Sequence, residues 1–324
     1  MKRDLVPLLL APLLIAVAFP FVGSAASWVT LTVAGLAMGL MIFVMASGLT
    51  LTFGLMDVLN FGHGAFIAVG AFVAASVMLA LGPWMSAESL ALNLAAVAPA
   101  ILAAMVVSGV LGLAFERVIV RPVYGQHLKQ ILVTTGGLIV AEQLIKVVWG
   151  PEQITLTRPA ALRGAFLLGD VAIEKYRVLA VVVGLVVFAV LALTLNRTRI
   201  GLLIRAGVEN GEMVESLGYR IRRLFVGVFV VGSALAGLGG AMWGLYQETV
   251  TAGIGGQVIV LVFIVIIIGG LGSVGGCFVG ALLVGLTANY IGFLAPKVAL
   301  GSNILLMALI LLWRPQGLYP VAKR

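Results

Sequence analysis

Charged residues are scarce in this chain of 324 residues. Only 10% of its positions are Asp, Glu, Lys or Arg, whereas 62% are hydrophobic; a soluble domain carries about 25% charged residues. Too few polar side chains are therefore present to cover a globule in water. Since about 20 apolar residues cross a bilayer core, this content allows about ten helical spans. We expect an all-α, polytopic helical membrane protein whose surface is covered largely by membrane lipid.

Cysteine and histidine are almost absent. Cys277 is the one cysteine, and the two histidines are His63 and His127. This scarcity excludes a disulfide framework or a thiolate metal cluster, and it gives no support for a zinc site or a Ser-His-Asp triad. We therefore expect the chain to be no enzyme and to bind no metal or cofactor itself.

Nucleotide-binding motifs are also missing. No lysine follows a glycine, so the chain has no Walker loop of the form G-x-x-x-x-G-K-[ST]. Gly270 to Gly275 reads G-x-G-x-x-G, but a dinucleotide site needs an acidic residue about 20 positions later, and no Asp or Glu follows Glu248. The glycines instead predict a break between membrane helices. If ATP powers this protein, another chain binds the nucleotide.

Lysine and arginine outnumber the acidic residues by 20 to 12. Because the basic residues flank apolar segments and interleave with few aromatics, we expect no nucleic-acid partner and assign them to cytoplasmic loops. The apolar segments predict eight to ten transmembrane helices. They lie near residues 5–22, 31–52, 62–81, 91–114, 131–149, 178–195, 225–246, 257–271, 276–295 and 302–313.

The basic clusters predict an orientation. With ten spans, the clusters within 117–129, 197–223 and 314–324 fall on the same side as the basic N-terminus. The positive-inside rule places that side, and with it both termini, in the cytoplasm. The loop 150–177 then lies outside, although it carries four basic residues.

A polar stretch separates two of the apolar segments. Asp57, Asn60 and His63 interrupt the sequence between Thr52 and Gly64. Non-helical backbone at membrane depth is tolerated only where protein buries it or where it lines a cavity. The stretch therefore indicates part of a substrate path or gate, with an ordinary cytoplasmic turn as the alternative.

Glu142 and Lys146 lie within an apolar segment. Ionisable residues inside a membrane helix usually face the interior of a bundle or water, and opposite charges at i, i+4 can pair. Glu142 is thus a candidate for the substrate path. A self-neutralised structural pair, with Lys146 reaching toward the outer interface, is the alternative.

The longest cytoplasmic loop, Asn196 to Arg223, contains the pattern of a short amphipathic helix. Asn210 is a good N-cap for a helix through Ser216, and Gly218 supplies a C-terminal stop. A rigid helix of this kind could dock a soluble motor subunit, with a solvated loop helix as the alternative. We expect Glu212 and Glu215 to face solvent, and Met213, Val214 and Leu217 to be free to pack on a partner.

Three segments carry a resemblance to a known family. They are Asp57-Val58-Leu59-Asn60-Phe61-Gly62-His63-Gly64; the loop motif with Thr198-Arg199-Ile200-Gly201, Arg205-Ala206, Glu209-Asn210 and Leu217-Gly218; and the ending Trp313-Arg314-Pro315-Gln316-Gly317-Leu318. In this order and spacing the chain resembles the membrane permeases of branched-chain amino acid ABC importers. Gly62 stands where that family often has Ala.

The resemblance implies the ABC importer permease fold, as a single transmembrane domain over residues 1–324 in a bacterial-type inner membrane. It also implies a homologous second permease, two ATP-binding subunits that hold ATP and Mg²⁺, and an extracytoplasmic substrate-binding protein. Residues 208–219 would be the segment that couples the permease to ATP hydrolysis. Two alternatives stay open: a permease for amides or urea, and an ATP-independent carrier or channel, although a carrier needs a cluster of buried carboxylates.

These observations give two sets of candidate residues. The candidate path consists of Asp57, Asn60, Phe61, Gly62, His63, Gly64 and Glu142. The candidate coupling residues are Arg205, Ala206, Glu209, Asn210, Glu212, Glu215, Leu217 and Gly218.

Overall fold

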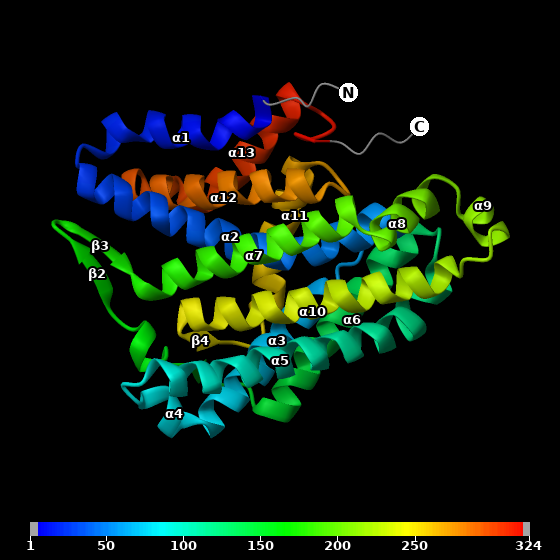
Figure 1. Cartoon of the computed structure of the whole chain (residues 1–324), viewed down its shortest axis with the longest axis horizontal. Coiled ribbons are helices and arrows are strands. Elements are labelled where there is room, and N and C mark those ends of the chain that lie inside the picture. The colour runs from blue at the N-terminus through cyan, green and yellow to red at the C-terminus, as the bar shows by residue number, and fades with distance from the viewer. Residues whose placement is uncertain (1–5, 320–324) are drawn as a thin grey trace. The chain divides into compact units, whose positions relative to one another are not determined.

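Ten apolar helices form most of the structure, a computed structural model that describes residues 6–319, except for the side chains of residues 55, 208, 209, 211, 212 and 300. Each of the ten predicted segments corresponds to one helix (Figure 1). The helices are α1 (Val6–Val22), α2 (Ala25–Met56), α3 (His63–Ala80), α5 (Leu90–Phe115), α6 (His127–Trp149), α7 (Lys175–Arg197), α10 (Ile221–Gln247), α11 (Ile254–Gly269), α12 (Val274–Leu294) and α13 (Ala299–Trp313).

Seven of these helices are long and apolar enough to cross a membrane, whereas α1, α11 and α13 are shorter. A helix suits this setting because it satisfies its backbone hydrogen bonds internally, which lipid cannot do. The prediction of a polytopic helical membrane protein is confirmed.

Short elements connect the apolar helices. The strands were not predicted from the sequence, and of the short helices only α9 (Gly211–Ser216) was, because such elements depend on a partner or on only a few residues. The short helices are α4 (Gly82–Ser86), η1 (Glu116–Val120), η2 (Arg121–Val123), η3 (Ala160–Leu162), α8 (Arg199–Glu209), α9 (Gly211–Ser216) and η4 (Pro296–Val298). The strands are β1 (Ile154–Thr155), antiparallel to β4 (Thr249–Val250), and β2 (Ala165–Leu168), antiparallel to β3 (Val171–Glu174).

The chain divides into two compact units, which are described separately. The described part of the first unit comprises residues 6–43, 162–191 and 261–319, and that of the second comprises 44–161 and 192–260. The helices α2, α7 and α11 contribute residues to both units.

In the first unit, α2 packs on α12 through small residues. A Cβ atom on Gly39 would lie 2.6 Å from the carbonyl oxygen of Ala281, so the two backbones approach as closely as glycine permits. At the turn between α11 and α12, Gly270 and Gly272 have φ angles of 96° and 81°, which glycine adopts readily. The G-x-G-x-x-G sequence is therefore a helix break, as predicted.

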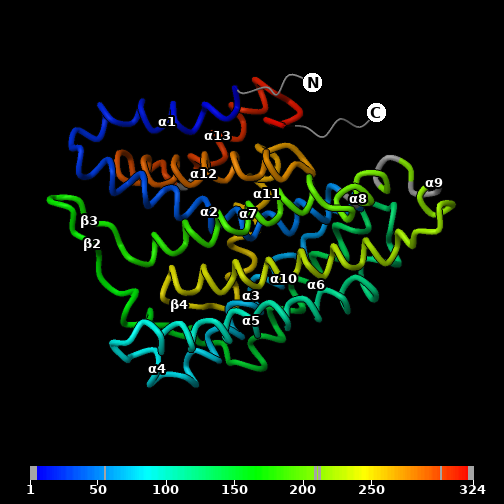
Figure 2. Tube along the Cα trace, in the orientation of Figure 1, coloured from blue at the N-terminus to red at the C-terminus, as the bar shows by residue number. Residues whose placement is uncertain are grey.

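In the second unit, α3, α5 and α10 pack against one another, and α6 packs on α3. The helices α5 and α10 run side by side (Figure 1; Figure 2). Small residues mark the crossings: a Cβ on Gly70 would lie 2.5 Å from the carbonyl oxygen of Gly237. The Ser108 hydroxyl donates to the carbonyl oxygen of Phe66 at 3.1 Å. This tight packing fixes the start of α3, where the polar stretch ends.

Candidate functional site

The polar stretch folds back along the helix that precedes it. The helix α2 ends at Met56, and Asp57 adopts a left-handed conformation with φ of 52°. His63, the first residue of α3, is buried, and its Nε2 lies 2.9 Å from the carbonyl oxygen of Met45. Met45 is eleven residues before the end of α2, or about 16 Å along the helix. The helix α3 therefore begins beside the interior of a membrane helix and not beside its end.

Side chains of the polar stretch differ in their surroundings. Asp57 is exposed, and its Oδ2 lies 3.9 Å from Nε2 of His127. Asn60 is 1% exposed, and neither its Oδ1 nor its Nδ2 has a hydrogen-bond partner among the described residues. The backbone N–H of Phe61 donates to Oγ1 of Thr134 at 3.1 Å. The stretch is thus held by protein on one side and reaches the surface at Asp57.

Two glycines bring the start of α3 against other helices. Gly62 lies against the ring of Phe115, at the end of α5. A Cβ on Gly64 would lie 2.7 Å from the carbonyl oxygen of Gly255 and 3.2 Å from Cδ1 of Leu138. Gly255 belongs to the first turn of α11, and Leu138 lies at the middle of α6. The first turns of α3 and α11 therefore meet beside the midpoint of a membrane helix.

Glu142 and Lys146 form the ion pair that the sequence suggested. Glu142 Oε1 lies 3.0 Å from Lys146 Nζ, and the two side chains are 30% and 35% exposed, respectively. The same oxygen is 3.9 Å from the position of a Cβ on Gly253, directly before α11. The structure thus brings Glu142 close to Gly253, at the start of α11, although the two residues are far apart in the sequence.

The short loop helix forms as predicted. The helix α9 ends at Ser216, and the side-chain oxygen of Asn210 accepts a hydrogen bond from the backbone N–H of Met213 at 2.9 Å. Gly218 follows with φ of 88°, the left-handed conformation that ends many helices. The preceding helix, α8, was not predicted; Thr198 caps it by accepting from the N–H of Gly201 at 3.3 Å.

One face of α9 differs from the expectation. Met213 and Leu217 are exposed, as expected for side chains free to meet a partner, but Val214 is only 3% exposed. The prediction for Val214 was wrong because α9 packs on α8 and α10 of the same chain. An amphipathic pattern does not say whether the same chain or a partner covers the apolar face of a helix.

The remaining coupling candidates surround this helix. Glu215 is exposed; Arg205 is also exposed, and its Nε donates to the carbonyl oxygen of Gly201 at 3.3 Å. Ala206 is half-buried, and its carbonyl oxygen accepts from the N–H of Asn210 at 2.9 Å. The side chains of Glu209 and Glu212 lie outside the described residues.

A basic hollow adjoins α9. It has a volume of about 400 Å³, and one acid and three arginines are among the residues that line it. The sequence pattern marked these arginines only as topological signals, because their shared surface depends on the fold of the loop. The hollow is lined by Glu215, Gly218, Tyr219, Arg220, Arg222 and Arg223.

Outside the basic hollow, Tyr124 forms a hydrogen bond with a buried acid, Glu116. The Tyr124 hydroxyl donates to Oε1 of Glu116 at 2.8 Å, and Glu116 is 1% exposed. Burial, followed by the hydrogen bond and the negative charge of Glu116, raises the pKa of Tyr124, against smaller opposing effects of Arg222 and Arg121. Tyr124 therefore remains a hydrogen-bond donor at physiological pH. Neither residue was identified from the sequence, since their contact requires the turn η1–η2.

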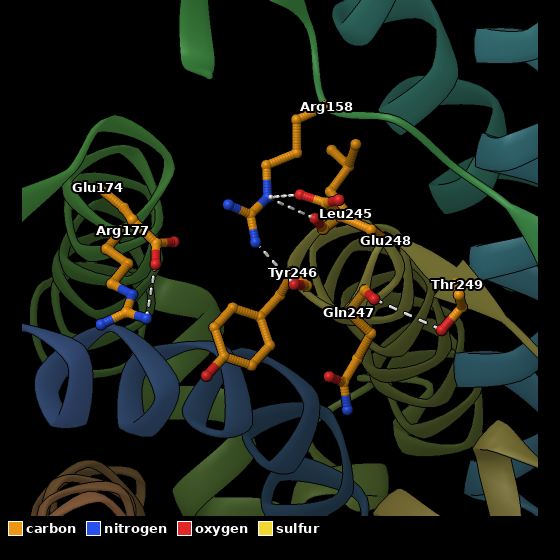
Figure 3. A network of polar contacts seen from close by, with 8 residues as sticks. All are labelled: Arg158, Glu174, Arg177, Leu245, Tyr246, Gln247, Glu248 and Thr249. Atoms are coloured by element: carbon orange, nitrogen blue, oxygen red, sulfur yellow. Dashed lines mark hydrogen bonds and ion pairs between the residues drawn. The ribbon is translucent and has the colours of Figure 1, made fainter. Parts of the chain in front are cut away.

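An arginine caps the far end of α10. Arg158 donates from Nε to the carbonyl oxygen of Leu245 at 3.0 Å and from Nη2 to that of Tyr246 at 2.9 Å. Its Nε also lies 3.0 Å from Oε1 of Glu248 (Figure 3). A cation at a helix C-terminus stabilises the last carbonyl groups. Arg158 thus fixes the segment that leads from α10 through β4 to α11.

Comparisons with known proteins agree over most of the chain. The model of a family described as branched-chain amino acid transport system, permease component, matches residues 31–313. The permease protein BraD of the high-affinity branched-chain amino acid transport system of Pseudomonas aeruginosa is 29% identical over 294 residues, covering 88% of this chain and 93% of BraD.

Two further relatives carry similar names. The corresponding permease protein LivH of Escherichia coli is 26% identical over 291 residues, covering 88% of this chain and 92% of LivH. A probable LivH of Methanocaldococcus jannaschii is 24% identical over 293 residues, covering 86% and 88% of the two chains. No solved structure matches the chain.

Proposed function

This chain belongs to the family of permease components of branched-chain amino acid transport systems, and we propose that it is the membrane-spanning subunit of an ATP-driven importer for branched-chain or related amino acids. The observation that carries the proposal is the family match over residues 31–313, which includes α2 from residue 31 onward and all of the apolar helices from α3 to α13. The chain is a transporter subunit and not an enzyme.

The proposed assembly contains a homologous second permease, two ATP-binding subunits and an extracytoplasmic substrate-binding protein. ATP and Mg²⁺ bind on the partner subunits. The loop 196–223 supports this arrangement, because it presents a capped helix with Met213 and Leu217 exposed beside a basic hollow. A rigid helix with exposed apolar side chains can bind a docked subunit and transmit its conformational change to the membrane helices.

We place the protein in a bacterial-type inner membrane with both termini in the cytoplasm. The basic residues of the loop 196–223 support this orientation, since cytoplasmic loops are enriched in Lys and Arg. The single transmembrane domain then presents α8 and α9 to the ATP-binding subunits and the loop 150–174 to the substrate-binding protein.

The proposed mechanism is alternating access. ATP binding and hydrolysis on the partners displace α9, and the membrane helices rearrange around the path that Asp57 to Gly64 and Glu142 line. The contact of α9 with α10 supports this route, because α10 packs directly on α3, which begins at the path residue His63. Release of substrate follows on the cytoplasmic side.

Affinity purification of the tagged chain in mild detergent, with assays of ATPase activity and uptake, tests the proposal. We expect a second permease and Walker-motif subunits to co-purify, and leucine uptake into proteoliposomes to require ATP and a substrate-binding protein. Recovery of the chain alone, with solute flux in liposomes without ATP, would establish a carrier or channel instead.

A further inference from the structure

We propose that Glu142 and Lys146 bind the charged groups of a zwitterionic amino acid at the point where α3 and α11 begin. The inference rests on the proposed importer function and adds a substrate site to it. The substrate ammonium pairs with Glu142, and the substrate carboxylate pairs with Lys146 and the first turn of α11.

The position of the pair is the first argument. Glu142 lies one helical turn after Leu138, at the middle of α6, and Leu138 contacts the start of α3 at Gly64. Gly64 in turn meets Gly255, in the first turn of α11. The first turns of α3 and α11 thus meet one helical turn from a charged pair within a membrane helix. Helix ends that meet at membrane depth are the arrangement by which transporters bind substrates near the middle of the bilayer.

The local field is the second argument. The first turn of a helix leaves backbone N–H groups without intrahelical acceptors, and the helix dipole adds partial positive charge there. Glu142 Oε1 lies beside Gly253, directly before the 16 residues of α11. In the structure, the Glu142 carboxylate thus occupies a place that favours an anion. A substrate carboxylate can take the same place when Glu142 turns to the substrate ammonium.

Charge balance is the third argument. An uncompensated charge within a membrane is costly, so a site for a zwitterion needs both charges neutralised when it is empty. The 3.0 Å contact between Glu142 and Lys146 provides this neutralisation. Substrate binding exchanges one ion pair for two, with no net charge entering the membrane. A neutral amide or urea has no such match, so the pair favours amino acids as substrates.

Access is the fourth argument. Both side chains of the pair are about one-third exposed. The structure around Glu142 and Lys146 therefore leaves part of each charged side chain uncovered, and a ligand can reach both charges.

The test combines single substitutions with ligands that each lack one charge. Radiolabelled leucine binding is measured on the purified assembly of permeases and ATP-binding subunits, with 4-methylpentanoate, which lacks the ammonium group, and 3-methylbutylamine, which lacks the carboxylate, as competitors. On the unmodified assembly we expect leucine to bind at least tenfold more tightly than either analogue.

The substitutions should remove these preferences separately. With Glu142→Gln, leucine should lose its advantage over 4-methylpentanoate; with Lys146→Gln, it should lose its advantage over 3-methylbutylamine. The matched control is the Glu174–Arg177 pair at the start of α7, whose side chains lie 2.8 Å apart. Neutralising that pair should change no ligand preference.

Glu142→Asp is the second variant, for the case that Glu142→Gln does not assemble. It keeps the charge but shortens the side chain, and it should weaken leucine binding severalfold.

The outcomes separate the site from the function. Unchanged ligand preferences in the Glu142 and Lys146 variants would overturn the site, while ATP-dependent leucine uptake by the unmodified assembly would leave the importer function intact. Absence of that uptake would overturn the importer function, and the inferred site with it.

Discussion

Gly64 and Gly255 lie backbone to backbone, so that a methyl group on Gly64 would stand 2.7 Å from the carbonyl oxygen of Gly255. This contact joins the first turns of α3 and α11. Neither helix could begin where it does with a larger residue at either position, because the clash is with backbone and no flexible side chain can move aside.

Gly64→Ala should therefore impair both stability and uptake. We expect a loss of about 1–3 kcal/mol in the free energy of unfolding, as for overpacking in a tight core, and a larger fractional loss of leucine uptake because the candidate path is displaced. Thermal unfolding in detergent and uptake by proteoliposomes measure the two effects. Gly136→Ala is the matched control, since a Cβ there meets nothing within 4 Å. Equal behaviour of the two variants would contradict the argument.

Asn210→Ala should uncouple ATP hydrolysis from uptake. The substitution removes the side-chain oxygen that accepts from the Met213 N–H, which weakens α9 by about 1 kcal/mol. ATPase activity should persist while uptake falls, and Asn210→Ser should restore uptake because serine is also a good N-cap. Replacing Glu212 and Glu215 by Lys, which reverses both charges, should also uncouple ATP hydrolysis from uptake. Transport that stays unaltered both in Asn210→Ala and in the variant with Glu212 and Glu215 replaced by Lys would exclude a coupling role for α9.

Arg158→Met should destabilise the connection from α10 to α11. The aliphatic part of the side chain is kept, but the carbonyl oxygens of Leu245 and Tyr246 and the carboxylate of Glu248 lose their donor. We expect a cost of about 1–3 kcal/mol, with faster hydrogen exchange at β1 and β4. Arg163→Met, in the same loop, is the comparison. Unchanged exchange at β4 would show that Arg158 does not hold this segment.

Features that depend on a short stretch of sequence were predictable. Each membrane helix follows from its own apolar run, and the cap at Asn210 follows from residues within one turn. The contact of Gly64 with Gly255 joins residues far apart in the chain, and Arg158 acts on the end of α10, so no local pattern reveals either. Val214 illustrates the same limit: its apolar character was visible in the sequence, but the packing of α9 on α8 and α10 was not.

Tyr124 should make stability depend on pH in the alkaline range. Its pKa is raised by burial and by the hydrogen bond to Glu116, so the folded state keeps the proton where the unfolded chain loses it. The stabilisation is fully present below the ordinary tyrosine pKa of about 10 and declines as the pH rises above it. Tyr124→Phe removes the donor to a buried carboxylate and should cost about 1–3 kcal/mol at neutral pH. The difference in the free energy of unfolding between the unmodified protein and Tyr124→Phe should narrow above about pH 10. Unfolding in detergent at a series of pH values measures this difference. The control is Tyr219→Phe, at an exposed tyrosine, which should show no such narrowing. A difference that stays constant up to the pH at which both proteins unfold would show that the Tyr124 proton does not stabilise the fold.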